Sequence, residues 1–348
     1  MLKTILMPFD GSELAVHALP YAVALARSTN ARLVLTYALA PWELSFDAPA
    51  HLHIIGAELR QAGIAVTTHV SNTNGVNPGR AILSVASDVH ADIIVMGTHA
   101  HGTVGRTLFG SVADDVVRHA AVPVLFCTAQ ANRQWPEERP RRLLVPLDGS
   151  ALAETALAPA EQLALGIGAS VDLVGVVDVA NVAVVPGSTP LEAFLAMLVA
   201  ETQRNLERLA EGLRERRVVA DVYTRAGVPE QVITQLAVEL LTDIIVMASH
   251  GRGGVARMLL GSVALQVMQR STVPVLLFQP AAVTARRVET PRNAPEETAD
   301  REQVYPELTP EDPALVKHAL GLARRAAGGD ERTRRDAEQL LARLPSPA

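Results

Sequence analysis

Short apolar runs alternate along the chain with longer segments in which apolar residues recur at helical spacing. This alternation predicts βα units and a parallel sheet that is buried on both faces. In the first part of the chain we expect strands at about 3–8, 31–38, 64–70, 92–96 and 123–127, with helices at about 12–28, 51–62, 78–89 and 111–120.

The same alternation returns after residue 140. There we expect strands at about 142–147, 170–177, 218–224, 243–247 and 274–278, with helices at about 151–165, 190–216, 229–241 and 262–270. Because crossovers between parallel strands are right-handed, each part should fold into a doubly wound, five-stranded sheet. The predicted fold class is α/β, with two tandem Rossmann-like domains and a charged, partly helical C-terminal tail.

The two parts of the chain are repeats of each other. The segment TILMPFDGS at 4–12 returns as RLLVPLDGS at 142–150, and the segment at 92–125 matches the one at 243–276 with 19 of 34 positions identical. Repeats of this length are the mark of duplicated domains. We therefore expect domains at 1–128 and 141–280, joined by a linker at 129–140 that mixes proline and charge.

The tail at 281–348 differs in composition from both repeats, because it holds 11 basic and 12 acidic residues in 68 positions. Proline and scattered charge predict disorder over 281–312, whereas 313–327 and 331–344 have helical spacing. Two interpretations stay open. The tail is a solvated segment or cover for one domain, or it is an element that binds an unknown protein partner.

Overall composition excludes several functional classes. With 31 Lys+Arg against 37 Asp+Glu, the net charge of -6 offers no basic surface for nucleic acid. Lysine occurs only at Lys3 and Lys317, so no P-loop is present. We expect a soluble, cytoplasmic protein without a membrane partner, because the chain has neither a signal peptide nor an apolar run long enough to span a bilayer. The single cysteine, Cys127, lies in an apolar strand and should be a buried thiol.

The loop after the first strand of each repeat reads Asp-Gly-Ser. Asp10 and Ser12 stand in the first repeat, and Asp148 and Ser150 in the second. Ligands of doubly wound sheets bind beyond the carboxyl ends of the strands, where an aspartate can accept hydrogen bonds from a ligand and a serine can cap the next helix. The same tripeptide is also an ordinary strand-to-helix turn, so a structural role for it stays open.

A glycine-containing loop follows the fourth strand of each repeat and leads into a helix that begins with serine. Such a loop favours anion binding, since glycine admits close approach of phosphate and a helix N-terminus presents free N–H groups. The alternative is that glycine and serine only begin a helix. The residues are Gly97, Gly110 and Ser111 in the first repeat, and Ala248, Gly251, Gly261 and Ser262 in the second.

These residues resemble those of the universal stress proteins, and the resemblance covers about 1–127 and 140–280. That family's ATP-binding pattern is Gly, two residues, Gly, nine residues, Gly, then Ser or Thr, with an aspartate after strand one. The resemblance implies that ATP is the cofactor, with Mg²⁺ held through its phosphates. It also implies that Asp10 and Asp148 contact adenine, which Ala38 and Val176 line from strand two.

Each repeat departs from that pattern by one glycine. Ala100 replaces the second glycine of the first repeat, and Ala248 replaces the first glycine of the second repeat. An added methyl group restricts the backbone and crowds a phosphate, so we expect altered or weaker nucleotide binding. The second site should be the stronger one, because it keeps Gly251 next to the phosphates.

Histidines stand at matching loop positions, His99 and His250. A general base for phosphate hydrolysis needs a supporting acid, a second histidine or a metal, and the sequence supplies none nearby, so we expect these histidines to bind the loop backbone. The resemblance therefore implies an adenine-nucleotide sensor or regulator of a stress response rather than a metabolic enzyme. The alternatives are a scaffold that binds no nucleotide and a weak ATPase.

The fifth strands, VPVLFC at 122–127 and VPVLLF at 273–278, would each leave an unpaired apolar edge in an isolated domain. The universal stress proteins cover this edge by dimerisation, and the tandem chain resembles a covalent version of that dimer. We expect an intramolecular pseudo-dimer related by a pseudo-two-fold axis. Pairing of two chains into a homodimer is a further option.

Overall fold

The computed structural model describes residues 2–39, 47–72, 77–98, 110–132, 135, 139–179, 191–249 and 261–279. The predicted disorder and helices of the tail lie outside the described residues. The first repeat contains β1 (Thr4–Pro8), α1 (Glu13–Thr29), β2 (Arg32–Leu39), α2 (Asp47–Gln61), β3 (Val66–Asn72), α3 (Pro78–Asp88), β4 (Ile93–Thr98), α4 (Ser111–His119) and β5 (Val124–Thr128).

The second repeat has the same order of elements with one difference. It contains β6 (Arg142–Leu147), α5 (Ala151–Glu154), α6 (Leu157–Ile167), β7 (Ser170–Asp178), α7 (Leu191–Glu215), β8 (Ala220–Gly227), α8 (Pro229–Glu239), β9 (Ile244–Ala248), α9 (Ser262–Arg270) and β10 (Val275–Phe278). All ten predicted strands are confirmed. The prediction of one helix over 151–165 is wrong, because the segment forms two helices, α5 and α6, with a turn at Thr155 and Ala156.

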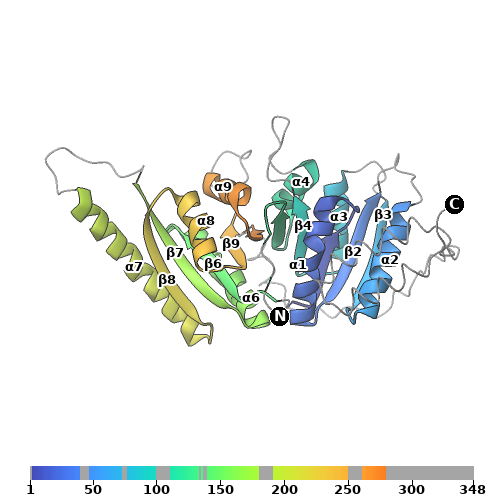
Figure 1. Ribbon diagram of the computed structural model, residues 1–348, viewed down its shortest axis with the longest axis horizontal. Coiled ribbons are helices and arrows are strands. Elements are labelled where there is room, and N and C mark those ends of the chain that lie inside the picture. The colour runs from blue at the N-terminus through green and yellow to red at the C-terminus, as the bar shows by residue number, and fades with distance from the viewer. Residues whose placement is uncertain are drawn as a thin grey trace.

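The strands form one ten-stranded sheet in the order β3-β2-β1-β4-β5-β10-β9-β6-β7-β8. Each repeat contributes five parallel strands, and the two sets meet where β5 and β10 pair antiparallel, with Leu125 opposite Leu276. Figure 1 shows the repeats on either side of this junction. The expected pseudo-two-fold arrangement is therefore confirmed, and each fifth strand covers the edge of the other.

Helices cover both faces of the sheet, so alternate strand residues enter two different cores. Ile5 belongs to the core beneath α1, α2, α6 and α7, whereas its neighbour Leu6 belongs to the core beneath α3, α4, α8 and α9. Both side chains are completely buried. This burial on both faces explains why the strands read as continuous apolar runs rather than as alternating ones.

The predicted linker contributes to the packing between the repeats. Trp135 is only 8% exposed, and its Nε1 donates a hydrogen bond of 3.2 Å to the carbonyl oxygen of Asp243 in the second repeat. Its ring meets Tyr21 of α1 edge-on at a centroid distance of 5.0 Å. The Tyr21 hydroxyl in turn donates to the carbonyl oxygen of Ala131 at 2.9 Å. The segment between the domains is thus anchored to both of them.

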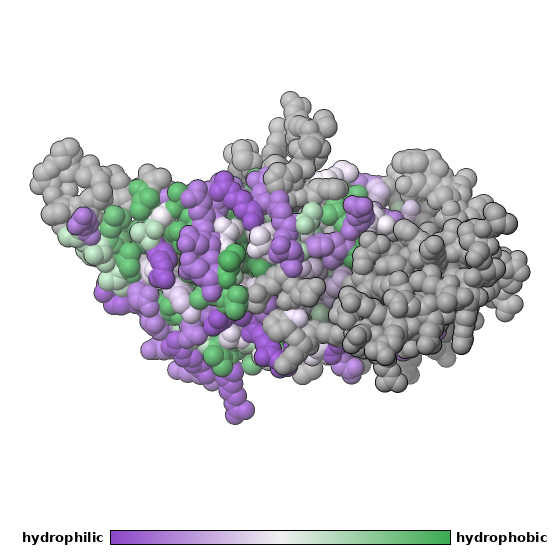
Figure 2. Space-filling view, viewed as in Figure 1, coloured by the Kyte–Doolittle hydropathy of each residue, from purple (hydrophilic) through white to green (hydrophobic). Residues whose placement is uncertain are grey.

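The surface is polar over most of the second repeat, and Figure 2 shows apolar residues scattered between hydrophilic ones on the visible face. Among the described residues, the exposed large apolar side chains all lie in that repeat, at Leu165, Val179, Met197, Val219, Val228, Val238 and Leu241. No helix in the described ranges has the length and apolar character needed to cross a membrane.

Candidate functional site

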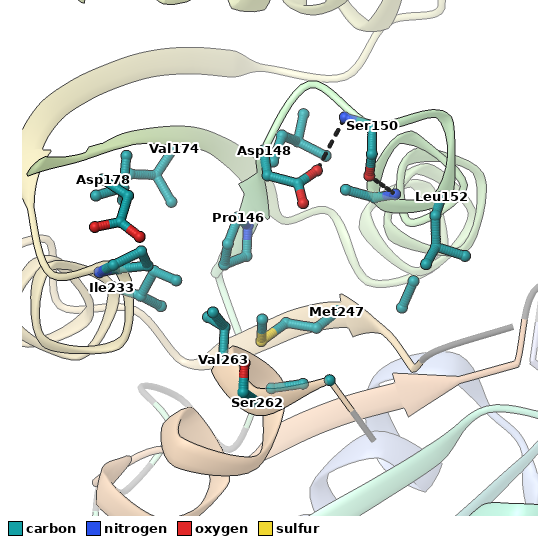
Figure 3. Close-up of a pocket in the computed structure, with 17 residues that line it drawn as sticks. Pro146, Asp148, Ser150, Leu152, Val174, Asp178, Ile233, Met247, Ser262 and Val263 are labelled. Atoms are coloured by element: carbon teal, nitrogen blue, oxygen red, sulfur yellow. Dashed lines mark hydrogen bonds between the residues drawn. The ribbon is translucent and has the colours of Figure 1, made fainter. Parts of the chain in front are cut away.

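Two pockets lie beyond the carboxyl ends of the strands, one in each repeat. The pocket of the first repeat, called pocket one, has a volume of about 470 Å³, and that of the second repeat, called pocket two, has a volume of about 460 Å³. Small-molecule sites are typically about 300–1,000 Å³. Figure 3 shows pocket two, which is formed by the ends of β6 and β7, the end of β9, and the first residues of α5, α8 and α9.

The Asp-Gly-Ser segments adopt the same turn in both repeats. The Ser12 backbone N–H donates to Asp10 Oδ1 at 3.0 Å, and the Ser12 hydroxyl oxygen accepts the N–H of Ala15 at 3.2 Å, which caps α1. The second repeat repeats this turn with Asp148 and Ser150 at 2.9 and 3.1 Å, as the dashed lines in Figure 3 show. The structural role of the motif is therefore confirmed, and its aspartate and serine also line the pocket in each repeat.

The helices α4 and α9 begin at the pockets, with Ser111 and Ser262 as their first residues. Among the described residues, no side chain caps either N-terminus, and free N–H groups at a helix start are suited to an anion. The preceding glycines differ in conformation. Gly110 has φ 80°, whereas Gly261 has φ -59°, which any residue can adopt. The backbone conformation of the residue that precedes the helix therefore differs between α4 and α9.

Gly97 is required by packing, because the N-terminal turn of α1 passes directly over it. A Cβ at this position would lie 2.6 Å from the carbonyl carbon of Leu14 and closer still to its oxygen. The second repeat has Ala248 here, and there the equivalent helix is interrupted between α5 and α6. The helix break and the extra methyl group therefore occur together.

The two pockets are built almost alike. Their walls carry the same residue at twelve equivalent positions, given as first and second repeat: Pro8 and Pro146, Asp10 and Asp148, Ser12 and Ser150, Leu14 and Leu152, Ala15 and Ala153, Pro78 and Pro229, Ile82 and Ile233, Met96 and Met247, Gly110 and Gly261, Ser111 and Ser262, Val112 and Val263, Ala113 and Ala264. The aspartate and the capping serine of the Asp-Gly-Ser turn and the N-terminus of α4 or α9 thus line each pocket, and pocket two is lined by a second carboxylate, Asp178.

The structure brings twelve of the predicted site residues to the pockets. Pocket one is lined by Asp10, Ser12, Ala38, Gly97, Gly110 and Ser111, and pocket two by Asp148, Ser150, Val176, Ala248, Gly261 and Ser262. His99, His250 and Gly251 lie outside the described residues, as does Ala100.

Several pocket residues were missed by sequence reasoning. Thr36 is among the residues that line pocket one, and Asp178 lies at the β7 end of pocket two. Ile82, Met96 and their counterparts stand at matching positions of the repeats, so an alignment of the two halves could have found them. Thr36 and Asp178 have no such signal, because their counterparts are Val174 and Ala40.

Comparison with known proteins supplies the family. The sequence model of the universal stress protein family matches residues 1–128 and 140–279. The chain belongs to the universal stress protein family. A curated universal stress protein of Mycolicibacterium smegmatis is 29% identical over 296 residues, which are 79% of this chain and 97% of that protein.

Two solved structures share the tandem fold. A universal stress protein from Archaeoglobus fulgidus is 21% identical with a TM-score of 0.60, and covers 80% of this chain and 98% of its own. A putative universal stress protein from Pseudomonas aeruginosa is 18% identical with a TM-score of 0.61, and covers 82% of this chain and 96% of its own. At these identities the likeness establishes the fold alone.

This universal stress protein also buries ionisable groups away from the pocket walls. Cys127 is completely buried, as expected, and burial raises the pKa of its thiol. Asp172 of β7 is completely buried and forms an ion pair with Arg142, with 2.9 Å between Oδ2 and Nε. Burial raises the pKa of Asp172 to about 6, although Arg142 lowers it, and Asp221 on the adjacent strand adds to the rise.

Proposed function

We propose that this universal stress protein binds ATP or a related adenine nucleotide in its two pockets, and that it acts in the cytoplasm as a sensor or regulator of a stress response. The observation that supports the proposal most strongly is that the two pockets are lined by the same residue at equivalent positions. Two copies of one pocket have kept the same carboxylate, the same uncapped helix N-terminus and the same apolar sides at twelve equivalent positions.

The chemistry of the walls suits the two ends of a nucleotide. Apolar side chains such as Ile233 and Val176 can hold a flat base, while the Asp148 carboxylate can accept hydrogen bonds from its amino group. The phosphates would lie at the start of α9, where N–H groups and the helix dipole favour negative charge. Asp10, Ala38, Ile82 and α4 would serve pocket one in the same way.

A role in sensing is favoured over catalysis. The described residues hold no group of three or more His, Cys, Asp or Glu that could bind a metal ion on its own. Mg²⁺ would therefore arrive with the nucleotide phosphates. The described pocket walls also carry no histidine, lysine or arginine for proton transfer or for a leaving phosphate.

The experiment that tests this proposal is titration of nucleotide-free, full-length protein with ATP and Mg²⁺. The matched variants Ala38→Phe and Val176→Phe place a large side chain at the same position of each pocket, and Val219→Phe is the control because Val219 is 67% exposed and lines neither pocket. We expect each pocket variant to remove one binding event and the double variant to remove both. Binding that survives in the double variant would overturn the assignment, and no binding by the wild type would favour a scaffold.

A further inference from the structure

The first part of α7 carries an apolar surface that the equivalent helix of the first repeat lacks. Residues 193–200 contain no polar side chain, and none of them is buried; Met197 is 52% exposed. In the first repeat, α2 has 15 residues against 25 in α7, and it buries Leu52, Ile55 and Leu59. A helical segment that is apolar all round is normally buried, so the start of α7 calls for a cover.

The start of α7 has too little strand beneath it to be covered by the sheet. The middle of the helix lies over β7, because a Cβ on Gly175 would collide with the side chain of Thr202. Gly175 stands three residues before the end of β7, which is about 10 Å of strand. The eleven residues from Leu191 to Thr202 span about 16 Å of helix. The first turns of α7 therefore reach past the strand on which the rest of the helix packs.

Two valines at the strand ends extend the apolar surface. Val179 and Val228 directly follow Asp178 and Gly227, the last paired residues of β7 and β8, and they are 42% and 36% exposed. We call residues 193–200, Val179 and Val228 the α7 patch. Figure 2 shows hydrophobic residues at the outer end of the second repeat, where Figure 1 places the start of α7. Apolar patches of this kind mark sites of interaction.

We propose that the C-terminal tail of this chain covers the α7 patch through the segment 313–327. The structure describes the chain up to Gln279, directly after β10. The strands β10, β9, β6, β7 and β8 are parallel, so the tail leaves the sheet at the edge at which α7 begins. Four strand spacings, about 19 Å, separate β10 from β8. A chain as long as 280–312 spans about 30 Å on average without regular structure, which is enough to reach the patch.

The segment 313–327 also matches the patch in chemistry. Its apolar residues recur at helical spacing, and the large ones are Leu315, Val316, Leu320 and Leu322. It contains one lysine and two arginines but no aspartate or glutamate, whereas the charged residues that bound 193–200 in α7 are the exposed Glu192 and Glu201. Opposite charges beside an apolar contact favour this pairing. A second copy of the patch would instead bring glutamates to both sides of the interface.

The test is cysteine cross-linking in the full chain. Met197→Cys with Leu320→Cys places one thiol in the patch and one in the tail segment. The control pair is Val219→Cys with Leu320→Cys, because Val219 is 67% exposed and precedes β8 at the opposite edge of the sheet. The native Cys127 is completely buried and does not compete. With diamide as oxidant and dilute protein, we expect the intramolecular disulfide to form about tenfold faster in the first pair, since docking raises the local concentration of the tail thiol.

Rates within threefold of each other would mean that the tail does not dock on the patch, and would overturn the inference. A disulfide between two chains in Met197→Cys alone would also overturn it, because a second copy would then cover the patch. The linked peptides and the mass of the product, measured by mass spectrometry, distinguish these outcomes.

The reactivity of single cysteines gives a second readout. Met197→Cys in the full chain should react with a maleimide about tenfold faster once Leu315, Leu320 and Leu322 are replaced by serine, because the cover is lost. These serines lie outside the two repeats, and Val219→Cys should react equally fast with either tail. A Met197→Cys thiol that reacts no faster with the altered tail would contradict the inference. Neither readout involves nucleotide, so both outcomes are independent of the proposed function.

Discussion

Gln279, the residue that follows β10, donates a hydrogen bond from Nε2 to the carbonyl oxygen of Val117 at 3.0 Å. The same nitrogen contacts the carbonyl oxygen of Arg118, so the second repeat caps the C-terminal end of α4 in the first. The opposite end of α4 begins at Ser111 in pocket one. A similar contact joins the first repeat to the other pocket helix. The hydroxyl of Thr128, the last residue of β5, approaches at 3.5 Å the carbonyl oxygen of Ser271, the residue directly after α9. Each pocket helix is therefore held at its far end by the other repeat.

Loss of the Gln279 cap should weaken the junction between the repeats. We expect Gln279→Ala to lower the free energy of unfolding by about 1–2 kcal/mol, because two part-buried helix carbonyls lose their donor. Urea denaturation measures this change. Gln235→Ala is the matched control, since Gln235 lies on the exposed face of α8 and its side-chain amide donates to Glu239 Oε1 at 2.7 Å. An equal loss in both variants would show that the cap has no special weight.

Gly97 and Ala248 stand at equivalent positions, but replacing each by the residue found in the other repeat should change stability by different amounts. Gly97→Ala forces a methyl group against the Leu14 carbonyl and should cost about 1–3 kcal/mol of stability. Ala248→Gly removes a methyl group from a half-buried strand end and should cost no more than about 1 kcal/mol. Thermal denaturation of the two variants compares them directly. A harmless Gly97→Ala substitution would contradict the packing requirement.

The buried Asp172 should make stability depend on pH. Its folded pKa of about 6 lies above the ordinary value of 3.8, so the folded state binds more protons than the unfolded state between these values. The contribution of Asp172 is therefore fully present below about pH 4 and is lost as the pH rises through 6, by up to about 3 kcal/mol.

Asp172→Asn removes this titration, and the difference in unfolding free energy between variant and wild type should change in favour of the variant from pH 4 to pH 7.5. Asp221→Asn serves for comparison, because Asp221 is exposed on the adjacent strand. It should flatten the profile less, since Asp221 is only the smallest of the causes that shift the Asp172 pKa. A difference between Asp172→Asn and wild type that stays constant over this range would contradict the raised pKa.

Much of the fold could be predicted because the apolar runs of the strands are local in sequence and occur in both repeats. Apolar runs on strands buried from both sides predict parallel strands, and the repeats predict two copies of one domain. The antiparallel pairing of Leu125 with Leu276 could also be anticipated, since an apolar fifth strand needs a cover. The same repetition located Asp10, Ser111 and their counterparts at the pockets.

Other features depend on tertiary contacts that no local pattern records. The segment 151–165 was predicted as one helix, but it is divided into α5 and α6. Trp135 reads as part of a polar linker but is buried against Tyr21. Thr36 reads as an ordinary strand threonine, and only the geometry of the pocket reveals that its hydroxyl is unpaired.

The most direct test of nucleotide binding is to denature freshly purified, full-length protein and to measure the adenine nucleotide released per chain by chromatography. The comparison is the double variant Ala38→Phe, Val176→Phe, prepared in the same way. The account predicts adenine nucleotide from the wild type and none from the double variant. Equal amounts from both proteins, or none from the wild type even after incubation with excess ATP and Mg²⁺, would contradict it.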